Sequence, residues 1–377
     1  MASSVRWRGF RPWPGRVSRD STRISSLPAT RASQQKPTRH HRKKTTPTMT
    51  PNAGSSGNQQ NLQRLRKILA NQINTVARGK GVDPQLVRKQ YVFALFFKRI
   101  FHGNDHTWML LGGNALLIRA GGGRFTRDID LARDISWEDP EPVKDELQLL
   151  VDAGAQLDPF RFELGKIDPH SDPDSFGYGS KTAKITVTVW LGNRVFDAFV
   201  IDITNRRHAH GLVDMLPLSP VIEHDTLLDL PRVPVVAVEN HLADKICAMY
   251  ELHGRNNDQP STRYRDLADI VRLIESSRID AARLREVLGH EQQRRGISLP
   301  QYLHAPSPQW ASEFPRAAQD FAEYPADHHQ LDVSLTYAGA CVNPVLSGEI
   351  IAGRWEPASR SWQTAGELPS LRIYEEN

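Results

Sequence analysis

Two aspartates lie one residue apart in a short segment where acidic and aliphatic side chains alternate. The segment Asp128-Ile129-Asp130-Leu131 has the period of two that is typical of a β-strand, so both carboxylates are expected on one face. Their backbones would lie about 6.6–7 Å apart, a spacing at which they can share divalent ions. Because Mg²⁺ and Mn²⁺ prefer oxygen ligands and position phosphoryl oxygens, the pattern predicts a metal site for phosphoryl or nucleotidyl transfer.

A third acidic ligand would come from a neighbouring strand. Asp202 is the first candidate, because it ends the apolar run Phe199-Val200-Ile201, which can lie beside the Asp128 strand. Asp197, nearer the start of the same segment, is the alternative. The predicted metal ligands are therefore Asp128, Asp130 and Asp202.

A pair of glycines precedes the acidic segment. Gly112-Gly113-Asn114 lies between a predicted buried strand at Trp108–Leu111 and an apolar helical stretch from Ala115 to Arg119. Free backbone N–H groups and the helix dipole favour an anion at such a turn, and glycine lets a phosphate approach closely. Each motif alone is common in proteins without this function. Their order is what favours nucleotide binding at Gly112, Gly113 and Asn114, because a buried strand, a glycine turn, a helix and an acidic strand follow one another directly.

Four blocks in this order also occur in one known family. They are Leu111-Gly-Gly-Asn-Ala-Leu116 with Arg119, Phe125-Thr-Arg-Asp-Ile-Asp-Leu131, Glu239-Asn-His-Leu-Ala-Asp-Lys-Ile-Cys-Ala248, and Arg263-Tyr-Arg-Asp-Leu-Ala-Asp-Ile270. The chain thereby resembles the AbiEii/AbiGii nucleotidyltransferase-like toxins, which belong to the DNA polymerase β-type nucleotidyltransferase superfamily. The resemblance spans about residues 85–275 and weakens toward residue 345.

The resemblance implies a set of catalytic residues. Asp128 and Asp130 would hold the metal, Lys245 would contact a nucleotide phosphate, and Asp266 would be an essential acid. The chain departs from the family pattern at two positions. Arg265 replaces the usual lysine before Asp266 and keeps its charge with a different geometry, and Asn114 stands where the family often has a small hydroxyl residue.

Arginines near these motifs are expected to serve the bound nucleotide. Arg119 and Arg127 would each bind the triphosphate or pair with an aspartate. Arg263 would bind the nucleotide or pair with Asp266, which follows three residues later on the same predicted helix. Asp269 is expected to be solvated or to support the site from behind.

The resemblance also implies an activity. We expect a Mg²⁺- or Mn²⁺-dependent enzyme that transfers a nucleoside monophosphate from an NTP to an acceptor. By analogy with the family, the acceptor would be an RNA, for example a tRNA 3′ end, and the protein would be the toxin of a type IV toxin–antitoxin pair with a cognate antitoxin encoded nearby. The alternatives are transfer to a small molecule or a protein hydroxyl, and a nucleotide-binding module without turnover.

The surrounding sequence predicts an α/β (α+β) fold in which helices flank a mixed sheet. Further strands are expected at residues 184–191 and 194–203, joined as a hairpin by Gly192-Asn193, and an extended segment at 233–238. Helices are expected from Asn61 to about Gly79, from Pro84 with Asp83 as its cap, and at about residues 139–150, 239–252, 264–276 and 280–288.

Charge and composition suggest four regions. Residues 1–48 carry twelve Lys or Arg and one acid, a net charge of +11, and since the whole chain carries +5 the remainder carries −6. We therefore expect a disordered basic tail at residues 1–60, whose first 48 residues need not belong to the true protein because Met49 can be the start. A nucleotidyltransferase core at 61–235, a helical domain at 236–345 that completes the active site, and a tail at 346–377 would follow.

Several classes of protein are disfavoured. Only two cysteines occur in the 377 residues, Cys247 and Cys341, without the spacing of a disulfide framework or a zinc site. No apolar segment reaches the roughly 18–20 residues that cross a bilayer, so no membrane association is expected. The sequence predicts a soluble cytoplasmic protein.

Overall fold

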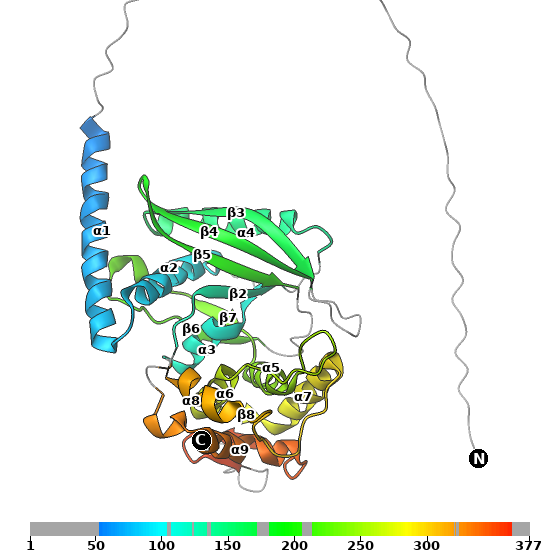
Figure 1. Cartoon of the computed structure of the whole chain (residues 1–377). Coiled ribbons are helices and arrows are strands. Elements are labelled where there is room, and N and C mark those ends of the chain that lie inside the picture. The colour runs from blue at the N-terminus through cyan, green and yellow to red at the C-terminus, as the bar shows by residue number, and fades with distance from the viewer. Residues whose placement is uncertain are drawn as a thin grey trace, which may run out of the picture. The chain divides into compact units, whose positions relative to one another are not determined.

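The computed structural model describes residues 53–103, 107–122, 124–133, 137–171, 181–205, 213–319, 321 and 324–363. Of the two predicted tails, at residues 1–60 and 346–377, the parts before residue 53 and after residue 363 lie outside the described residues. The described part is a mixed α/β structure with a seven-stranded sheet, a set of flanking helices and a mainly helical C-terminal region (Figure 1). The predicted fold class is confirmed.

The large sheet has the strand order β3-β4-β5-β2-β1-β7-β6. Its strands are β1 (Trp108–Leu110), β2 (Asp128–Arg133), β3 (Phe160–Ser171), β4 (Lys181–Leu191), β5 (Arg194–Thr204), β6 (Asp214–Pro217) and β7 (Arg232–Val235). β2 runs parallel to β5, and β1 runs parallel to β7, while the other neighbours are antiparallel. The chain therefore brings β2, which follows the glycine turn, to the centre of the sheet beside a strand far along the sequence.

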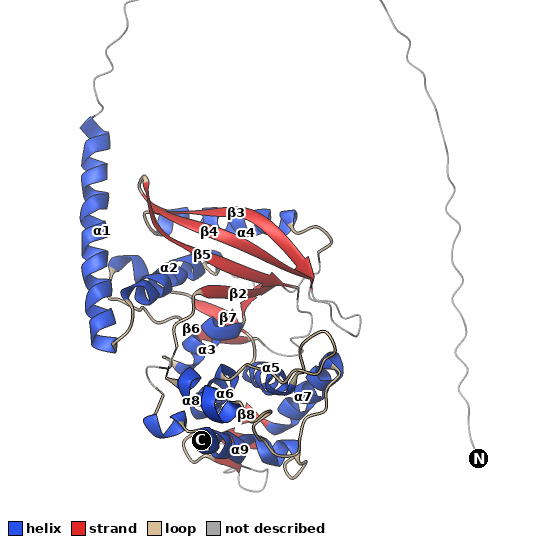
Figure 2. Ribbon diagram, viewed as in Figure 1, coloured by secondary structure: helices blue, strands red, loops and turns tan. Residues whose placement is uncertain are grey.

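Four helices from the N-terminal half accompany this sheet (Figure 2): three of them contact its strands, and the first packs on the second. They are α1 (Ala53–Lys80), α2 (Pro84–Ile100), α3 (Gly112–Ala120) and α4 (Glu141–Ala153). The rings of Phe93 and Phe96 on α2 lie 5.1 and 5.5 Å from the ring of Phe199 on β5, in edge-to-face contact. Burial of such aromatic side chains is a large share of the apolar area that stabilises a domain core.

A second hydrophobic core lies in the C-terminal half. Its helices are α5 (Val238–Tyr250), α6 (Arg265–Ser276), α7 (Ala281–Arg295), α8 (Trp310–Ala318) and α9 (Leu331–Leu346). A small sheet accompanies them, formed by β8 (Ile279–Asp280), β9 (Arg354–Glu356) and β10 (Ser361–Gln363). Short 3-10 turns occur at Ala155–Leu157, Asp225–Leu227 and Ala326–His329. Leu116 of α3 is buried in this second core, so α3 links it to the large sheet.

Some predicted boundaries are confirmed and others are wrong. Asp83 caps α2 as predicted, its side chain accepting a hydrogen bond from the Gln85 N–H at 2.8 Å. α1 begins at Ala53 instead of near Asn61, because a helix once nucleated extends cooperatively through weak helix formers. The strands β3 and β6 were not predicted, since neither carries a clear alternation of apolar residues along its length. Of the described helices, none is both long and apolar enough to span a bilayer.

A buried ion pair ties α2 to the start of β3. The Arg99 guanidinium donates hydrogen bonds to both carboxylate oxygens of Asp158, at 2.9 and 2.7 Å, and to the Phe160 carbonyl at 2.6 Å. The side chains of Arg99 and Asp158 are 1% and 0% exposed. Neither charge has access to water, so each depends on the other for its compensation.

We expect Asp158→Asn to lower the free energy of unfolding by about 3–5 kcal/mol, because the substitution leaves the Arg99 charge buried and unpaired. Urea denaturation followed by circular dichroism measures the change. Asp168→Asn is the matched control, since Asp168 pairs with Lys166 at side-chain exposures of 70% and 81%, and an exposed pair of this kind contributes about 0–1 kcal/mol. Equal losses in the two variants would contradict the assignment.

Candidate active site

Asp128, Asp130 and Asp202 lie on one face of the large sheet. Asp130 is the direct neighbour of Asp202 across the parallel β2–β5 pair. On β2 the buried Ile129 and Leu131 alternate with the exposed Asp128 and the partly exposed Asp130. The prediction that the two aspartates share a strand face is therefore confirmed.

Asp197 lies elsewhere. It is five residues before Asp202 on β5, an odd separation that directs the two side chains to opposite faces of a regular strand. The Lys89 ammonium of α2 donates a hydrogen bond to Asp197 at 2.9 Å, on the side of the sheet where α2 packs. Of the two candidates for a third ligand, only Asp202 is thus placed beside Asp130.

The three carboxylates have the chemistry and the common face that a divalent ion requires. Their side-chain oxygens do not converge, since within the described ranges no group of three Asp, Glu, His or Cys side chains is arranged to hold an ion. One reason is a lysine on the next strand: the Lys184 ammonium lies 3.3 Å from an Asp202 oxygen. Lys184 is half-exposed and flexible, so Asp202 can exchange this partner without a change in the backbone. The metal site therefore stays a prediction: the three aspartates share one face of the sheet, and among the described residues their oxygens are not gathered around a common point.

The first turn of α3 lies directly against Asp130. A Cβ atom added to Gly112 would be 1.9 Å from Oδ2 of Asp130, and one added to Gly113 would be 2.3 Å from the Thr126 methyl carbon. Gly112 also has φ +57°, in the left-handed region that favours glycine. Gly112 thus admits the Asp130 carboxylate to the N-terminal end of α3, where the helix dipole stabilises negative charge, and Gly113 makes room for Thr126.

Asn114 holds the start of α3 to β2. Its amide donates a hydrogen bond to the Asp128 carbonyl at 2.7 Å, and its oxygen accepts one from the Thr126 hydroxyl at 3.0 Å. The residue is 1% exposed. Both ends of the Asn114 amide are thus used to position β2, whereas the sequence predicted a contact with nucleotide.

A second polar cluster surrounds Lys245 on α5. The Lys245 ammonium lies 2.8 Å from an Asp266 oxygen and 2.7 Å from an Asp269 oxygen, and the three side chains are at most 8% exposed. Burial acts to lower the pKa of Lys245, but the two carboxylates outweigh it and the pKa is raised. Asp269 is 1% exposed and holds the Lys245 ammonium, so of its two predicted roles, solvated or supporting the site from behind, the structure agrees with the second.

Arg263 extends this cluster toward solvent. Its guanidinium donates a hydrogen bond to the second Asp266 oxygen at 2.6 Å while the Arg263 side chain stays 51% exposed. Burial acts to lower the pKa of Arg263, and Asp266 raises it by more. The i, i+3 pair foreseen from the sequence is formed, and it leaves the outer part of Arg263 accessible.

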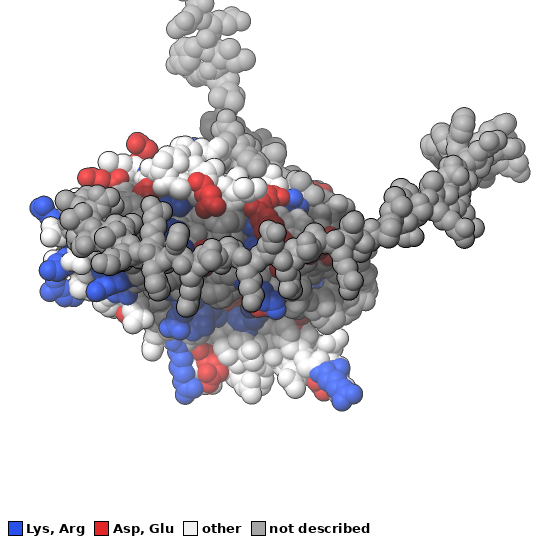
Figure 3. All heavy atoms as spheres, turned by 90° about the horizontal axis from the view of Figure 1, so that it is seen from above, with Lys and Arg blue, Asp and Glu red and all other residues white. Residues whose placement is uncertain are grey.

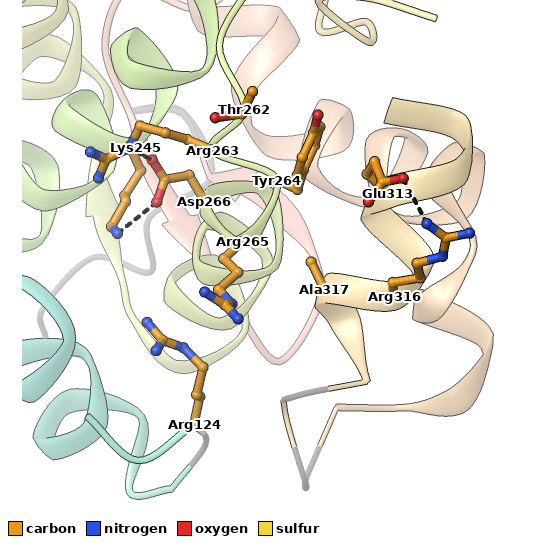
Figure 4. Close-up of a pocket in the computed structure, with 10 residues that line it drawn as sticks. All are labelled: Arg124, Lys245, Thr262, Arg263, Tyr264, Arg265, Asp266, Glu313, Arg316 and Ala317. Carbon is orange, nitrogen blue, oxygen red and sulfur yellow. Dashed lines mark hydrogen bonds and ion pairs between the residues drawn. The ribbon is translucent and has the colours of Figure 1, made fainter. Parts of the chain in front are cut away.

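The cluster forms one wall of a cavity of ≈ 530 Å³ (Figure 4). Its described lining contains five cationic and two acidic residues among ten: Arg124, Lys245, Thr262, Arg263, Tyr264, Arg265, Asp266, Glu313, Arg316 and Ala317. Figure 4 shows Arg124, which follows α3, and Arg265, which begins α6, directed into the same space. A surplus of cations in a concave site favours a polyanionic ligand.

Arg124 and Arg316 were missed as site residues by reasoning from sequence. A basic residue directly after Gly121-Gly122-Gly123 was the only available signal for Arg124. Nothing in the sequence relates Arg316 to the motifs, because α8 reaches the cavity only through tertiary packing.

Two predicted nucleotide-binding arginines do not line this cavity. Arg119 donates a hydrogen bond to the Val236 carbonyl at 2.7 Å and lies 2.8 Å from an Asp214 oxygen. Its side chain is 7% exposed, so of its two predicted roles Arg119 has taken the pairing with an aspartate. Arg127 is exposed on the surface just before β2.

α3 relates the cavity to the aspartate face. It packs against β2, which carries Asp128 and Asp130, and against α6, which carries Asp266. The family model described as "Nucleotidyl transferase AbiEii toxin, Type IV TA system" matches residues 95–335, more than half of the chain. The chain belongs to the AbiEii nucleotidyl transferase toxin family. The resemblance inferred from the four sequence blocks is thereby confirmed, and with it the assignment as a nucleotidyltransferase.

Solved structures similar to this AbiEii family member include two named proteins. JHP933 from Helicobacter pylori is 13% identical, with 71% of this chain and 95% of that chain covered and a TM-score of 0.40. MenT4, a nucleotidyltransferase toxin from Mycobacterium tuberculosis H37Rv, is 16% identical, with 72% and 98% covered and a TM-score of 0.41. The search of curated protein sequences found no significant match.

We expect Gly112→Ala to reduce nucleotidyl transfer by about 100-fold or more, because the new methyl group displaces the Asp130 carboxylate and a small misplacement of a catalytic group has an effect of this order. The activity is measured as pyrophosphate release. Gly121→Ala is the matched control: Gly121 has φ +68° and so suffers the same backbone strain, but a Cβ there meets nothing within 4 Å. Equal loss of activity in both variants would show that strain, not contact with Asp130, is responsible.

Proposed function

We propose that this AbiEii family member transfers a nucleoside monophosphate from an NTP to an RNA acceptor such as a tRNA 3′ end, and that an antitoxin restrains it. The observation that carries the proposal is the position of α3. Its N-terminal turn contacts Asp130, one of the three aspartates on the face of the sheet. The same helix packs on α6, which lines the cationic cavity around Lys245. One helix would thus support both the proposed metal site and the proposed polyphosphate site.

The cationic cavity suits the triphosphate of an NTP. The Lys245 ammonium is fixed by two carboxylates and keeps its proton, while Arg263 retains an exposed outer part. Arg124 adds a third positive group, whose Nε atom is buried without a hydrogen-bond partner among the described residues. Fixed charges of this kind attract phosphate oxygens strongly because no reorganisation is needed when the ligand binds.

Asp128, Asp130 and Asp202, none of which lines this cavity, would hold Mg²⁺ or Mn²⁺ on their face of the sheet. A divalent ion supplies neutralisation of phosphate charge and a fixed orientation of the reacting oxygens when it is bound. Asp130 keeps its carboxylate at the N-terminal turn of α3, and Asn114 fixes the Asp128 backbone. The acceptor hydroxyl forms its bond to the α-phosphorus as the bond to pyrophosphate breaks.

The first test is Asp128→Ala. We expect at least about 100-fold less label transferred from [α-³²P]NTP to cellular RNA, and loss of growth arrest on expression, because one of the predicted metal ligands is removed. Asp168→Ala is the control, an aspartate on β3 whose side chain is 70% exposed. Undiminished transfer or arrest by Asp128→Ala would overturn the proposed function.

The same labelling experiment identifies the acceptor. RNA, protein and small-molecule fractions are separated after incubation of the wild type with each labelled NTP in turn. Label in the RNA fraction supports the proposal, and label confined to protein or small molecules refutes the RNA acceptor. Binding of NTP with no pyrophosphate release over long incubation would assign a nucleotide-binding module instead.

A second prediction concerns the proton on Lys245. Both carboxylates raise its pKa against burial, so Asp269→Asn should lower that pKa and let the ammonium lose its proton as the pH rises. We expect the KM for NTP to increase as the pH rises through the alkaline range in Asp269→Asn but not in the wild type. A variant that only loosened the fold would shift KM equally at every pH, so a parallel pH profile would contradict the role of Lys245 in binding phosphate.

A further inference from the structure

Helix α1 has a charge unlike the rest of the described protein. Its 28 residues include five basic residues and no acidic one, namely Arg64, Arg66, Lys67, Arg78 and Lys80. Because residues 49–377 carry a net charge of −6 and α1 contributes +5, residues 81–377 carry −11. A strongly positive helix therefore stands on an otherwise negative body.

The exposed face of α1 is polar as well as basic. Arg64, Lys67 and Arg78 are exposed, and the other exposed positions from residue 58 to 80 are mostly asparagine and glutamine. Among the large apolar side chains of this helix only Ile68 is exposed, at 41%. In the view of Figure 3, blue side chains gather along the left margin, the side on which Figure 1 shows α1.

A groove runs between α1 and the tip of the β4–β5 hairpin. Its volume is ≈ 410 Å³, and its walls are the Gln59–Lys67 side of α1 and the hairpin residues Leu191–Arg194. None of the described residues that line it is acidic, while Arg66, Lys67 and Arg194 contribute three positive charges. The groove is thus a concave site with charge of a single sign.

Arg66 fixes the two walls to each other. Its guanidinium donates hydrogen bonds to the carbonyls of Val195, Leu191 and Arg194, at 3.2, 3.3 and 3.1 Å. Carbonyl groups satisfy the donors without neutralising the charge. Partial burial lowers the pKa of Arg66, and the positive charges of Arg194 and Arg88 lower it further. An anion in the groove would relieve this repulsion.

We propose that the groove and the exposed face of α1 bind the phosphate backbone of the RNA acceptor, an inference that rests on the proposed function. Lysine, arginine and amide side chains without acids form the contacts that nucleic-acid backbones receive in proteins. An acidic protein partner is less suited, because a protein interface also needs an apolar centre, which this face lacks. With 28 residues, α1 is about 42 Å long and can follow several phosphates.

The distance from this groove to the aspartates sets a minimum length for the acceptor. Arg194 at the hairpin tip and Asp202 lie on the same strand, eight residues apart, which corresponds to about 26 Å. At the roughly 3.4 Å phosphate spacing of a B-form strand this distance takes about eight steps, and an A-form RNA duplex, which rises less per step, needs at least as many. Only a longer acceptor can occupy the groove while its end is at the catalytic face.

The test removes charge from α1 while leaving Arg66 in place. In Arg64→Ala/Lys67→Ala we expect affinity for a fluorescently labelled tRNA to fall by about tenfold near 150 mM salt. The slope of log affinity against log salt should decrease by about 1.4–1.8, for two lost phosphate contacts. The control is Arg161→Ala/Lys166→Ala, two exposed cations on β3. The basic segment before residue 49 is identical in all variants and cannot cause a difference between them.

Transfer assays with RNA of two lengths separate this inference from the proposed function. The α1 variant should raise the KM for a 20-base-pair acceptor and leave a 4-base-pair acceptor unaffected, with an unchanged KM for NTP. Asp128→Ala should bind tRNA like the wild type and transfer nothing. The inference would be overturned, with catalysis left intact, if the α1 variant kept the tRNA affinity and the salt slope of the wild type. It would also be overturned if the α1 variant lost binding to polyglutamate but not to tRNA, which would indicate an acidic protein partner.

Discussion

The contact between the first turn of α3 and the Asp130 carboxylate is the constraint on which the rest of the site depends. There is no room for a side chain at Gly112 or Gly113, since Asp130 and Thr126 occupy that space. The same contact places a carboxylate at the positive end of a helix, where its charge is stabilised. Asp130 of β2 therefore lies against α3, and Asn114 of α3 holds the same strand by a hydrogen bond to the Asp128 carbonyl.

α3 belongs to both hydrophobic cores, and it thereby connects β2, which carries two of the aspartates, to α6, which carries Asp266. Its apolar residues pack partly on the large sheet, and Leu116 is buried among the C-terminal helices. The cluster around Lys245 needs such rigid support, because an ammonium held between Asp266 and Asp269 is stable in a buried position only while both partners remain in place. The outer edge of that cluster opens into the cationic cavity, where Arg124 arrives from the chain just beyond α3.

Charge is distributed in a way that the net value conceals. The cationic cavity and the surface of α1 are two separate positive regions on a body that is negative outside α1. Such a charge distribution favours binding of a polyanion at these two regions over the rest of residues 81–377, in agreement with the proposed sites for nucleotide and RNA. The two regions differ in form: one is a compact cavity suited to a triphosphate, and the other a long helix beside a groove.

Local patterns in the sequence determined several features correctly. The period of two in Asp128-Ile129-Asp130 fixed the shared face, Asp83-Pro84 fixed the start of α2, and four ordered blocks indicated the family, because each depends on residues close together in the chain. Tertiary structure alone decided which partners distant residues meet. Asp269 is buried against Lys245, Arg119 pairs with Asp214, and Arg316 lines the cavity because of the way α8 packs. Such pairings arise between segments that meet only when both cores have formed, and no periodicity or propensity in the sequence encodes them.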